Sequence, residues 1–173
     1  MRSARGFTLI EVLVALFVLA IGVVGAGAAQ LTAQRTRQQA ALGSEAALLA
    51  GALAARMQAN LPVAALPDAS NPYLAFEHDA ASSSPPAGGA SCFGADACDP
   101  LALAAFDLDE VRLALHERFP GARMAVCRDD APWDGAVRRY RWACSGTDGA
   151  PAVIKIGWHG AGDAPAHVLM VAR

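Results

Sequence analysis

A long apolar segment near the N-terminus constrains the fold of this chain more than any other feature. Between Phe7 and Ala29 the only ionisable side chain is Glu11. As an α-helix this segment extends about 35 Å, which is enough to cross a hydrocarbon core of about 30 Å. The basic residues Arg2 and Arg5 precede it, so the positive-inside rule places the N-terminus in the cytoplasm and exports the rest of the chain. We therefore expect residues 7–29 to span a membrane.

Glu11 argues against two simpler interpretations of this segment, a secretory signal and a plain signal anchor. A secretory signal combines a basic start, 7–15 apolar residues and a cleavage site of small residues. Ala26-Gly27-Ala28 fits such a site, but the apolar run is longer and contains a carboxylate. A plain signal anchor accounts for the length and leaves Glu11 unexplained.

A carboxylate in the bilayer costs about 2.5–3.5 kcal/mol on insertion scales and calls for a cationic partner. No Lys, Arg or His lies between Phe7 and Ala29. Cleavage after Gly6 would create a cation, the α-amine of Phe7. Within one helix this amine is near its own Glu11, but in a stack of staggered helices it could meet Glu11 of a neighbouring chain instead. Pairing between chains would neutralise both charges and set the stagger.

The run of residues from Gly6 to Leu16, GFTLIEVLVAL, resembles the class III signal of type IV pilins and of the pseudopilins of type II secretion. The resemblance implies that residues 1–6 are a prepilin leader. Prepilin peptidase would cleave between Gly6 and Phe7 and methylate the amine of Phe7. Glu11 would be the fifth residue of the mature chain and the glutamate used in assembly.

The remaining chain predicts a small exported domain. Residues 30–61 continue the first helix as an amphipathic half, whose apolar face is formed by Leu42, Ala46, Leu49, Leu53 and Met57. Pro62 ends this helix. Residues 62–100 are rich in Pro, Ala, Ser, Asp and Gly and predict a long loop. Residues 101–119 predict a second helix, capped by Asp99 and stopped by Pro120-Gly121.

The last third of the chain predicts β-strands. Four short segments are rich in β-branched or aromatic residues and are separated by Gly, Pro and Asp: 124–127, 137–144, 153–158 and 167–172. Residues 101–173 should therefore form a helix and a small antiparallel sheet, packed on the exported half of the first helix. The expected fold is α+β and pilin-like, with a long N-terminal helix whose first half is transmembrane.

The chain has four cysteines, Cys92, Cys98, Cys127 and Cys144. An even number on the exported side of a membrane favours disulfides, and the spacings C-x5-C and C-x16-C lack the close pairs of structural zinc sites. Three connectivities are open. We prefer Cys92–Cys98, which closes a short ring, and Cys127–Cys144, which flanks the loop between the first two strands.

A finer resemblance covers nearly the whole chain. Ala54 to Asn60, AARMQAN, is similar to the A-x-R-M-x-x-N ending of the first helix in PilV-type minor pilins, the type IV pilus modification proteins, and Cys98-Asp99-Pro100 also fits that family. Two departures are Val111, where a tryptophan is expected, and the basic run Arg138–Arg141.

The PilV-type resemblance implies a minor pilin of the inner membrane, with a periplasmic globular domain, that later joins a surface pilus. It would initiate or modify pilus assembly and so serve adhesion and twitching motility. Its partners would be other minor and major pilins, prepilin peptidase, the inner-membrane assembly machinery and membrane lipid. The alternative in the same class is a minor pseudopilin of a type II secretion system.

A ligand-binding subunit at a pilus tip is a third hypothesis. Arg138, Tyr140, Arg141 and Trp142, together with Arg139, could stack and neutralise a single nucleic-acid strand or hold a surface. A net charge of −2 makes nucleic acid the less favoured partner, and arginines covering aromatic side chains of an ordinary strand account for the same residues.

Nothing in the sequence indicates an enzyme, a cofactor or a metal site. No G-x-S-x-G, P-loop or dinucleotide motif occurs, and the four histidines (His78, His116, His159 and His167) do not follow a metal-ligand spacing. Asp107, Asp109 and Glu110 crowd the front half of the second helix, where solvation or pairing with the helix dipole explains them.

The leader motif generates a direct prediction about processing. We expect the mature chain to begin at Phe7 with a methylated α-amine, because the basic leader, Gly6 and the span that contains Glu11 occur together. The intact mass of protein purified from membranes measures this. A mature chain that begins at Ala29 would identify an ordinary secreted protein and end the pilin interpretation.

Overall fold

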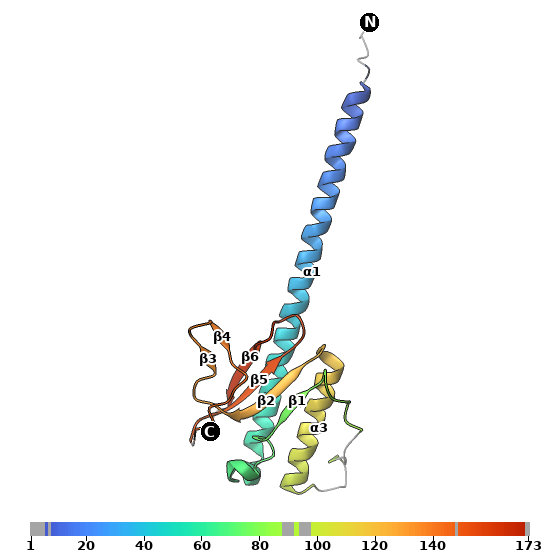
Figure 1. The fold of residues 1–173 in the computed structure, drawn as a ribbon. Helices are drawn as coiled ribbons and strands as arrows, with labels where there is room; N and C mark the ends of the chain where they lie inside the picture. Colours follow the sequence, from blue (N-terminus) through green and yellow to red (C-terminus); the bar gives the residue numbers. More distant parts are fainter. Residues whose placement is uncertain (1–5, 7, 88–91, 94–97, 148, 172–173) are drawn as a thin grey trace. The chain divides into compact units, whose positions relative to one another are not determined.

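In the computed structural model of the chain, the first helix, α1, runs from Leu9 to Ala59 (Figure 1). The structure describes residues 6, 8–87, 92–93, 98–147 and 149–171. The chain divides into two units, Met1–Ala40 and Ala41–Arg173, and each is described by itself. The first unit consists of the N-terminal part of α1. The second unit contains the C-terminal part of α1 and every other helix and strand.

A four-stranded antiparallel sheet is the main element of the second unit. The strands β1 (Glu77–Asp79), β2 (Arg123–Arg128), β5 (Ala152–Gly157) and β6 (His167–Val171) pair in the order β1-β2-β5-β6. The strands β3 (Trp133–Asp134) and β4 (Arg139–Tyr140) form a separate hairpin. With the long helix α1 and the second long helix α3 (Pro100–Arg118), this arrangement confirms the predicted α+β fold.

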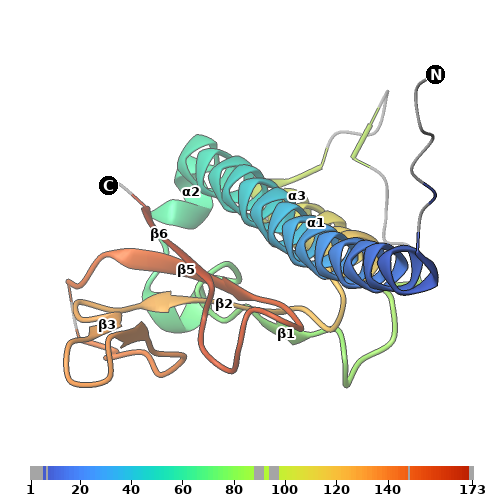
Figure 2. The ribbon, with the colours of Figure 1, turned by 90° about the horizontal axis from the view of Figure 1, so that it is seen from above.

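The hydrophobic core lies between the sheet and two helices. Figure 2 shows the part of α1 in the second unit and α3 on the same side of the sheet. The helices bury small and aliphatic residues, among them Ala46, Ala50, Leu53, Met57, Ala104, Leu108, Val111 and Leu115. The sheet supplies alternate residues of its strands: Met124, Val126, Ile154 and Ile156. The predicted apolar face of the first helix is confirmed at Ala46, Leu53 and Met57, whereas Leu42 and Leu49 are only partly buried.

The second long helix begins and ends close to where the sequence predicts. The side chain of Asp99 accepts a hydrogen bond from the backbone N–H of Ala102 at 2.8 Å, and Pro100 occupies the first turn. Phe119 caps the C-terminal end. Gly121 then adopts a φ of +57°, a left-handed conformation that favours glycine, and it turns the chain into β2.

Three sequence predictions about the second unit are wrong. The segment 62–100 is not one long loop, because it contains the short helix α2 (Leu61–Ala64), the 3-10 helix η1 (Asp68–Ser70) and β1. Pro62 lies in the first turn of α2, where its missing N–H costs nothing. The strand β1 escaped prediction because Glu-His-Asp has no β-branched residue, and pairing with β2 alone makes it a strand.

The predicted strand 137–144 is also wrong beyond Arg139–Tyr140, which pair with β3 and not with the main sheet. Arg138 adopts a φ of +52°, so the chain turns there, and the carbonyls of Trp142 and Ala143 accept hydrogen bonds from a lysine side chain in place of a strand partner. The predicted strand 167–172 is found as β6. It ends at Val171, and Ala172 lies outside the described residues.

A buried polar network joins α1 to α3. Arg56 Nη1 lies 3.1 Å from Asp107 Oδ1 and 2.7 Å from Glu110 Oε2. The hydroxyl of Tyr73 donates to Asp107 Oδ2 at 2.7 Å, and Asn60 Nδ2 donates to the carbonyl of Pro100 at 2.8 Å. Asp107 is therefore not on a solvated face, since it is 5% exposed. Burial, together with the hydrogen bond to Asp107, raises the pKa of Tyr73, so this hydroxyl stays a donor.

This network predicts which carboxylate of α3 matters for stability. Asp107→Leu should lower the free energy of unfolding by about 2–3 kcal/mol, because it leaves the buried hydroxyl of Tyr73 without an acceptor. Asp109→Leu is the matched control. Asp109 forms a partly exposed pair with Arg112 on the same helix, and such pairs contribute about 0.5 kcal/mol. Denaturation of the full chain in detergent measures both variants, and equal losses would contradict the network.

Candidate functional site

The first candidate site is the N-terminal part of α1. Every described residue from Thr8 to Ala41 is exposed, including Leu9, Phe17 and Val24, which are 79%, 67% and 73% exposed. By length and composition, α1 is long and apolar enough to cross a membrane. An apolar surface of this extent needs lipid or another protein to cover it. The segment therefore fits membrane anchoring.

Glu11 lies in the first turn of α1, where its backbone N–H donates to the carbonyl of Thr8 at 3.1 Å. A carboxylate is favourable at this end of a helix because the helix dipole is positive there. Its neighbours Ile10 and Leu13 are 69% and 56% exposed, so the single carboxylate is placed in an open apolar surface. Gly6 is exposed. Phe7 lies outside the described residues, and the pairing of its amine with Glu11 of another chain stays a prediction.

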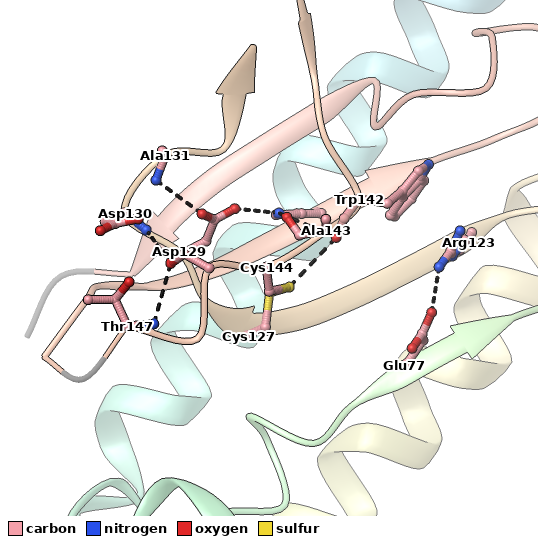
Figure 3. Close-up of a disulfide and its surroundings, with 12 residues drawn as sticks. Glu77, Arg123, Cys127, Asp129, Asp130, Ala131, Trp142, Ala143, Cys144 and Thr147 are labelled. Atoms are coloured by element: carbon pink, nitrogen blue, oxygen red, sulfur yellow. Dashed lines mark hydrogen bonds and ion pairs between the residues drawn. A yellow bond between two sulfur atoms is a disulfide. The ribbon is translucent and has the colours of Figure 1, made fainter.

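The second candidate site is in the cover segment, which we define as residues 129–147. Figure 3 shows this segment over β2 and β5. The register places Ala125 opposite Lys155 and Cys127 opposite Val153, on the face of the sheet turned away from the helices. The disulfide Cys127–Cys144 ties the cover segment to β2 (Figure 3).

The structure pairs all four cysteines, and no free cysteine occurs among the described residues. The preferred connectivity is confirmed, because Cys92 is bonded to Cys98 and Cys127 to Cys144. The smaller ring carries Phe93, whose side chain packs edge-to-face on Phe106 of α3, with ring centroids 5.0 Å apart.

Lys155 and Asp129 form a fully buried ion pair under the cover segment. Lys155 Nζ donates to Asp129 Oδ2 at 2.5 Å and to the carbonyl of Ala143 at 2.7 Å, and both side chains are at most 1% exposed. Burial by itself would raise the pKa of Asp129. The hydrogen bond and charge of Lys155, with backbone N–H donors that include Ala131, outweigh burial and hold this pKa below its usual value of 3.8. The carboxylate is therefore ionised at neutral pH.

The four residues of the predicted ligand patch make different contacts within the fold. Trp142 lies against the sheet: its Nε1 donates to the carbonyl of Asp163 at 2.8 Å, and the guanidinium of Arg123 lies 4.6 Å from its ring centroid. A Cβ on residue 157 would stand 2.9 Å from this ring, so the absence of a side chain on Gly157 leaves room for the indole. Arg141 donates to the carbonyl of Ala131.

The remaining patch residues lie on the β3–β4 hairpin. Arg138 and Arg139 are exposed, and Tyr140 packs edge-to-face on Trp133, with ring centroids 5.1 Å apart. Trp133 is 50% exposed and was not among the predicted site residues. The signal for it was Asp134-Gly135 just after it, a pair of residues that favours a hairpin.

The histidines are arranged in a way that their sequence spacing does not indicate. His78 of β1 and His116 of α3 approach with their Nε2 atoms 3.1 Å apart. His159 is exposed, and burial lowers the pKa of His167. Among the described residues, no group of three or more His, Cys, Asp or Glu side chains is placed to hold a metal ion.

Comparison with known proteins identifies one feature of the chain. Residues 1–27 match the family model described as the prokaryotic N-terminal methylation motif. No curated protein and no solved structure matches the chain. The motif supports a type IV pilin-like or pseudopilin-like protein that associates with pilus or secretion machinery, and the apolar helix fits its anchoring in a membrane.

The buried ion pair predicts an acid-sensitive contribution to stability. The pKa of Asp129 is depressed in the folded state, so the contribution is fully present above the ordinary pKa of 3.8. It is lost as the pH falls below that value, because the unfolded state then binds more protons. Asp129→Asn should lower the unfolding free energy at neutral pH by about 3–5 kcal/mol, since Lys155 stays buried without its counter-ion.

Denaturant midpoints of the full chain in detergent, measured from neutral pH to about pH 3, test this linkage. The wild type should lose more stability on acidification than Asp129→Asn. Asp130→Asn, which changes the exposed neighbouring carboxylate, should follow the wild type. Parallel curves for the wild type and Asp129→Asn would refute the linkage.

Proposed function

We propose that this chain is a minor pilin that takes part in initiating or modifying the assembly of a type IV pilus, with a structural role and no enzymatic activity. The observation that carries the proposal is the methylation motif over residues 1–27, which coincides with an exposed apolar helix. A single carboxylate, Glu11, lies in the first turn of this helix.

The proposed route begins in the inner membrane. The basic residues Arg2 and Arg5 stay in the cytoplasm, so the second unit reaches the periplasm, where its cysteines oxidise. Prepilin peptidase then cuts between Gly6 and Phe7 and methylates the new amine. The leader charges are lost in this step, and the mature N-terminus gains a cation close in sequence to Glu11.

The proposed role of Glu11 is charge pairing between chains. An ionised carboxylate among the apolar side chains of α1 is costly in lipid, and the amine of Phe7 from a neighbouring pilin neutralises it. Because the amine and the carboxylate of one chain are only four residues apart, pairing between chains offsets neighbouring helices along their axes. The partners are then other minor and major pilins and the inner-membrane assembly machinery.

The assignment to a PilV-type pilus protein is supported by the ending of α1. Arg56 and Asn60, the polar residues of the A-x-R-M-x-x-N pattern, bind Glu110 of α3 and the carbonyl of its first residue, and Met57 is 7% exposed in the core. The pattern therefore corresponds to a structural junction of the domain. A minor pseudopilin of a type II secretion system is the alternative that the methylation motif supports equally.

Deletion of the gene separates the two systems. Loss of surface pili and twitching motility, with normal protein secretion, supports the pilus assignment. Loss of protein secretion, with normal pili and motility, supports the pseudopilin.

A nucleic-acid-binding or surface-binding tip subunit is less favoured, because the side chains of Arg141 and Trp142 are hydrogen-bonded to backbone carbonyls within the fold.

The function of Glu11 yields a prediction about assembly. Glu11→Val should insert into the membrane at least as well as the wild type, because a costly carboxylate is removed, and it should be cleaved normally, because the leader and Gly6 are unchanged. Its recovery in sheared pili should fall, since it cannot neutralise the amine of a neighbour. Membrane abundance, processed fraction and pilus content are measured side by side.

Two further variants make this comparison specific. Glu11→Asp retains the charge and should restore part of the incorporation into pili. Glu45→Gln removes an exposed carboxylate of the same helix in the second unit, and its incorporation into pili should equal that of the wild type. Incorporation of Glu11→Val at the wild-type level would show that charge pairing is not the role of Glu11.

A further inference from the structure

The histidine pair lies between an edge strand and a helix of the second unit. The Nε2 atoms of His78 and His116 are 3.1 Å apart, and their rings meet at an interplanar angle of 70°. Ser83 Oγ lies 3.2 Å from the same nitrogen of His78. Both histidines are half-buried and Ser83 is exposed, so small ions in solvent can reach this cluster.

The hydrogen bonds indicate where the protons of this cluster are. Ser83 Oγ donates its only proton to the carbonyl of Asp79 at 2.5 Å, so toward His78 it can only accept. His78 Nε2 therefore carries the proton in this arrangement, and His116 Nε2 presents a lone pair to it. One proton thus lies among His78 Nε2, His116 Nε2 and Ser83 Oγ. Nitrogen and oxygen atoms with lone pairs are also what a metal ion binds.

The spacing of the two nitrogens suits a single metal ion. Two imidazole nitrogens bound to zinc at about 2.0–2.1 Å lie about 2.9–3.4 Å apart for bond angles between 90° and tetrahedral. The observed 3.1 Å is within this interval, so the separation of the two nitrogens matches that of two imidazole ligands of one ion. The displaced proton moves from Nε2 to Nδ1 of His78, which keeps this imidazole neutral.

The charges around the pair permit a cation. Burial and the positive charge of Arg112 lower the pKa of His78, whereas Asp79 raises it. The positive charge of Arg112 disfavours a bound metal ion, but its guanidinium is paired with Asp109 at 2.6 Å. The negative charge of Asp79 favours the ion.

We propose that His78 and His116 form a binding site for one divalent transition-metal ion, such as Zn²⁺, with water in the open positions beside Ser83. Imidazole ligands select Zn²⁺, Cu²⁺ and Ni²⁺ over Mg²⁺ and Ca²⁺. The ion would join β1, the edge strand of the sheet, to α3. It would thereby stabilise the three-residue strand β1, which pairs with β2 alone.

Calorimetric titration of untagged, processed, full-length protein in detergent with ZnCl₂ tests the site. We expect one ion per chain, and we expect His78→Gln and His116→Gln each to weaken binding by at least about tenfold. His159→Gln, which changes an exposed histidine outside the pair, should stay within about twofold of the wild type. Titration with CaCl₂ should give no saturable binding.

A measurement on the wild type alone guards against variants that fail to fold. Zn²⁺ should protect His78 and His116 from modification by diethyl pyrocarbonate, read by peptide mapping, and should leave His159 reactive. The proposal is overturned if Zn²⁺ does not bind, if binding survives when His78→Gln and His116→Gln are combined in one chain, or if the two paired histidines are not protected.

Discussion

The division of helix α1 between two environments is the constraint on which the rest of the structure depends. From Thr8 to Ala41 its described side chains are exposed, and from Ala46 to Met57 one face is buried in a core. The exposed half is apolar and must be covered by lipid or protein. The buried half presents Ala46 and Ala50, both 0% exposed, and small residues at this spacing let a helix approach its neighbours closely.

Two buried polar groups organise the elements around that core. Asp107 holds Arg56 from α1 and Tyr73 from the segment between α1 and α3, so it joins helices that apolar packing alone would leave free to slide. On the opposite face of the sheet, Lys155 of β5 binds Asp129 and the carbonyls of the cover segment, so it joins this segment to the sheet. Both groups are expensive to bury unpaired, which penalises alternative packings in which the partners are apart.

The candidate sites of the chain differ in how much of the fold they require. The proposed processing and assembly rest on a short linear motif around Gly6 and Glu11, within the segment that matches the methylation motif. The histidine pair depends on the antiparallel pairing of β1 with β2, which carries His78 to His116 of α3. The β3–β4 hairpin displays Trp133 and two arginines, whereas Trp142 serves to cover the sheet.

The sequence by itself determined the features that rest on local pattern: the apolar segment with Glu11, the helix capped by Asp99 and the strands β2, β5 and β6, whereas it left three disulfide connectivities open. Periodicity, capping and hydropathy act within a few residues, so they can be recognised without a fold. Only the tertiary structure decided the strand character of Glu77–Asp79, the burial of Asp107, and the turn that detaches residues 141–144 from the sheet. Each of these depends on a partner distant in the chain, and neither propensity nor spacing contains that partner.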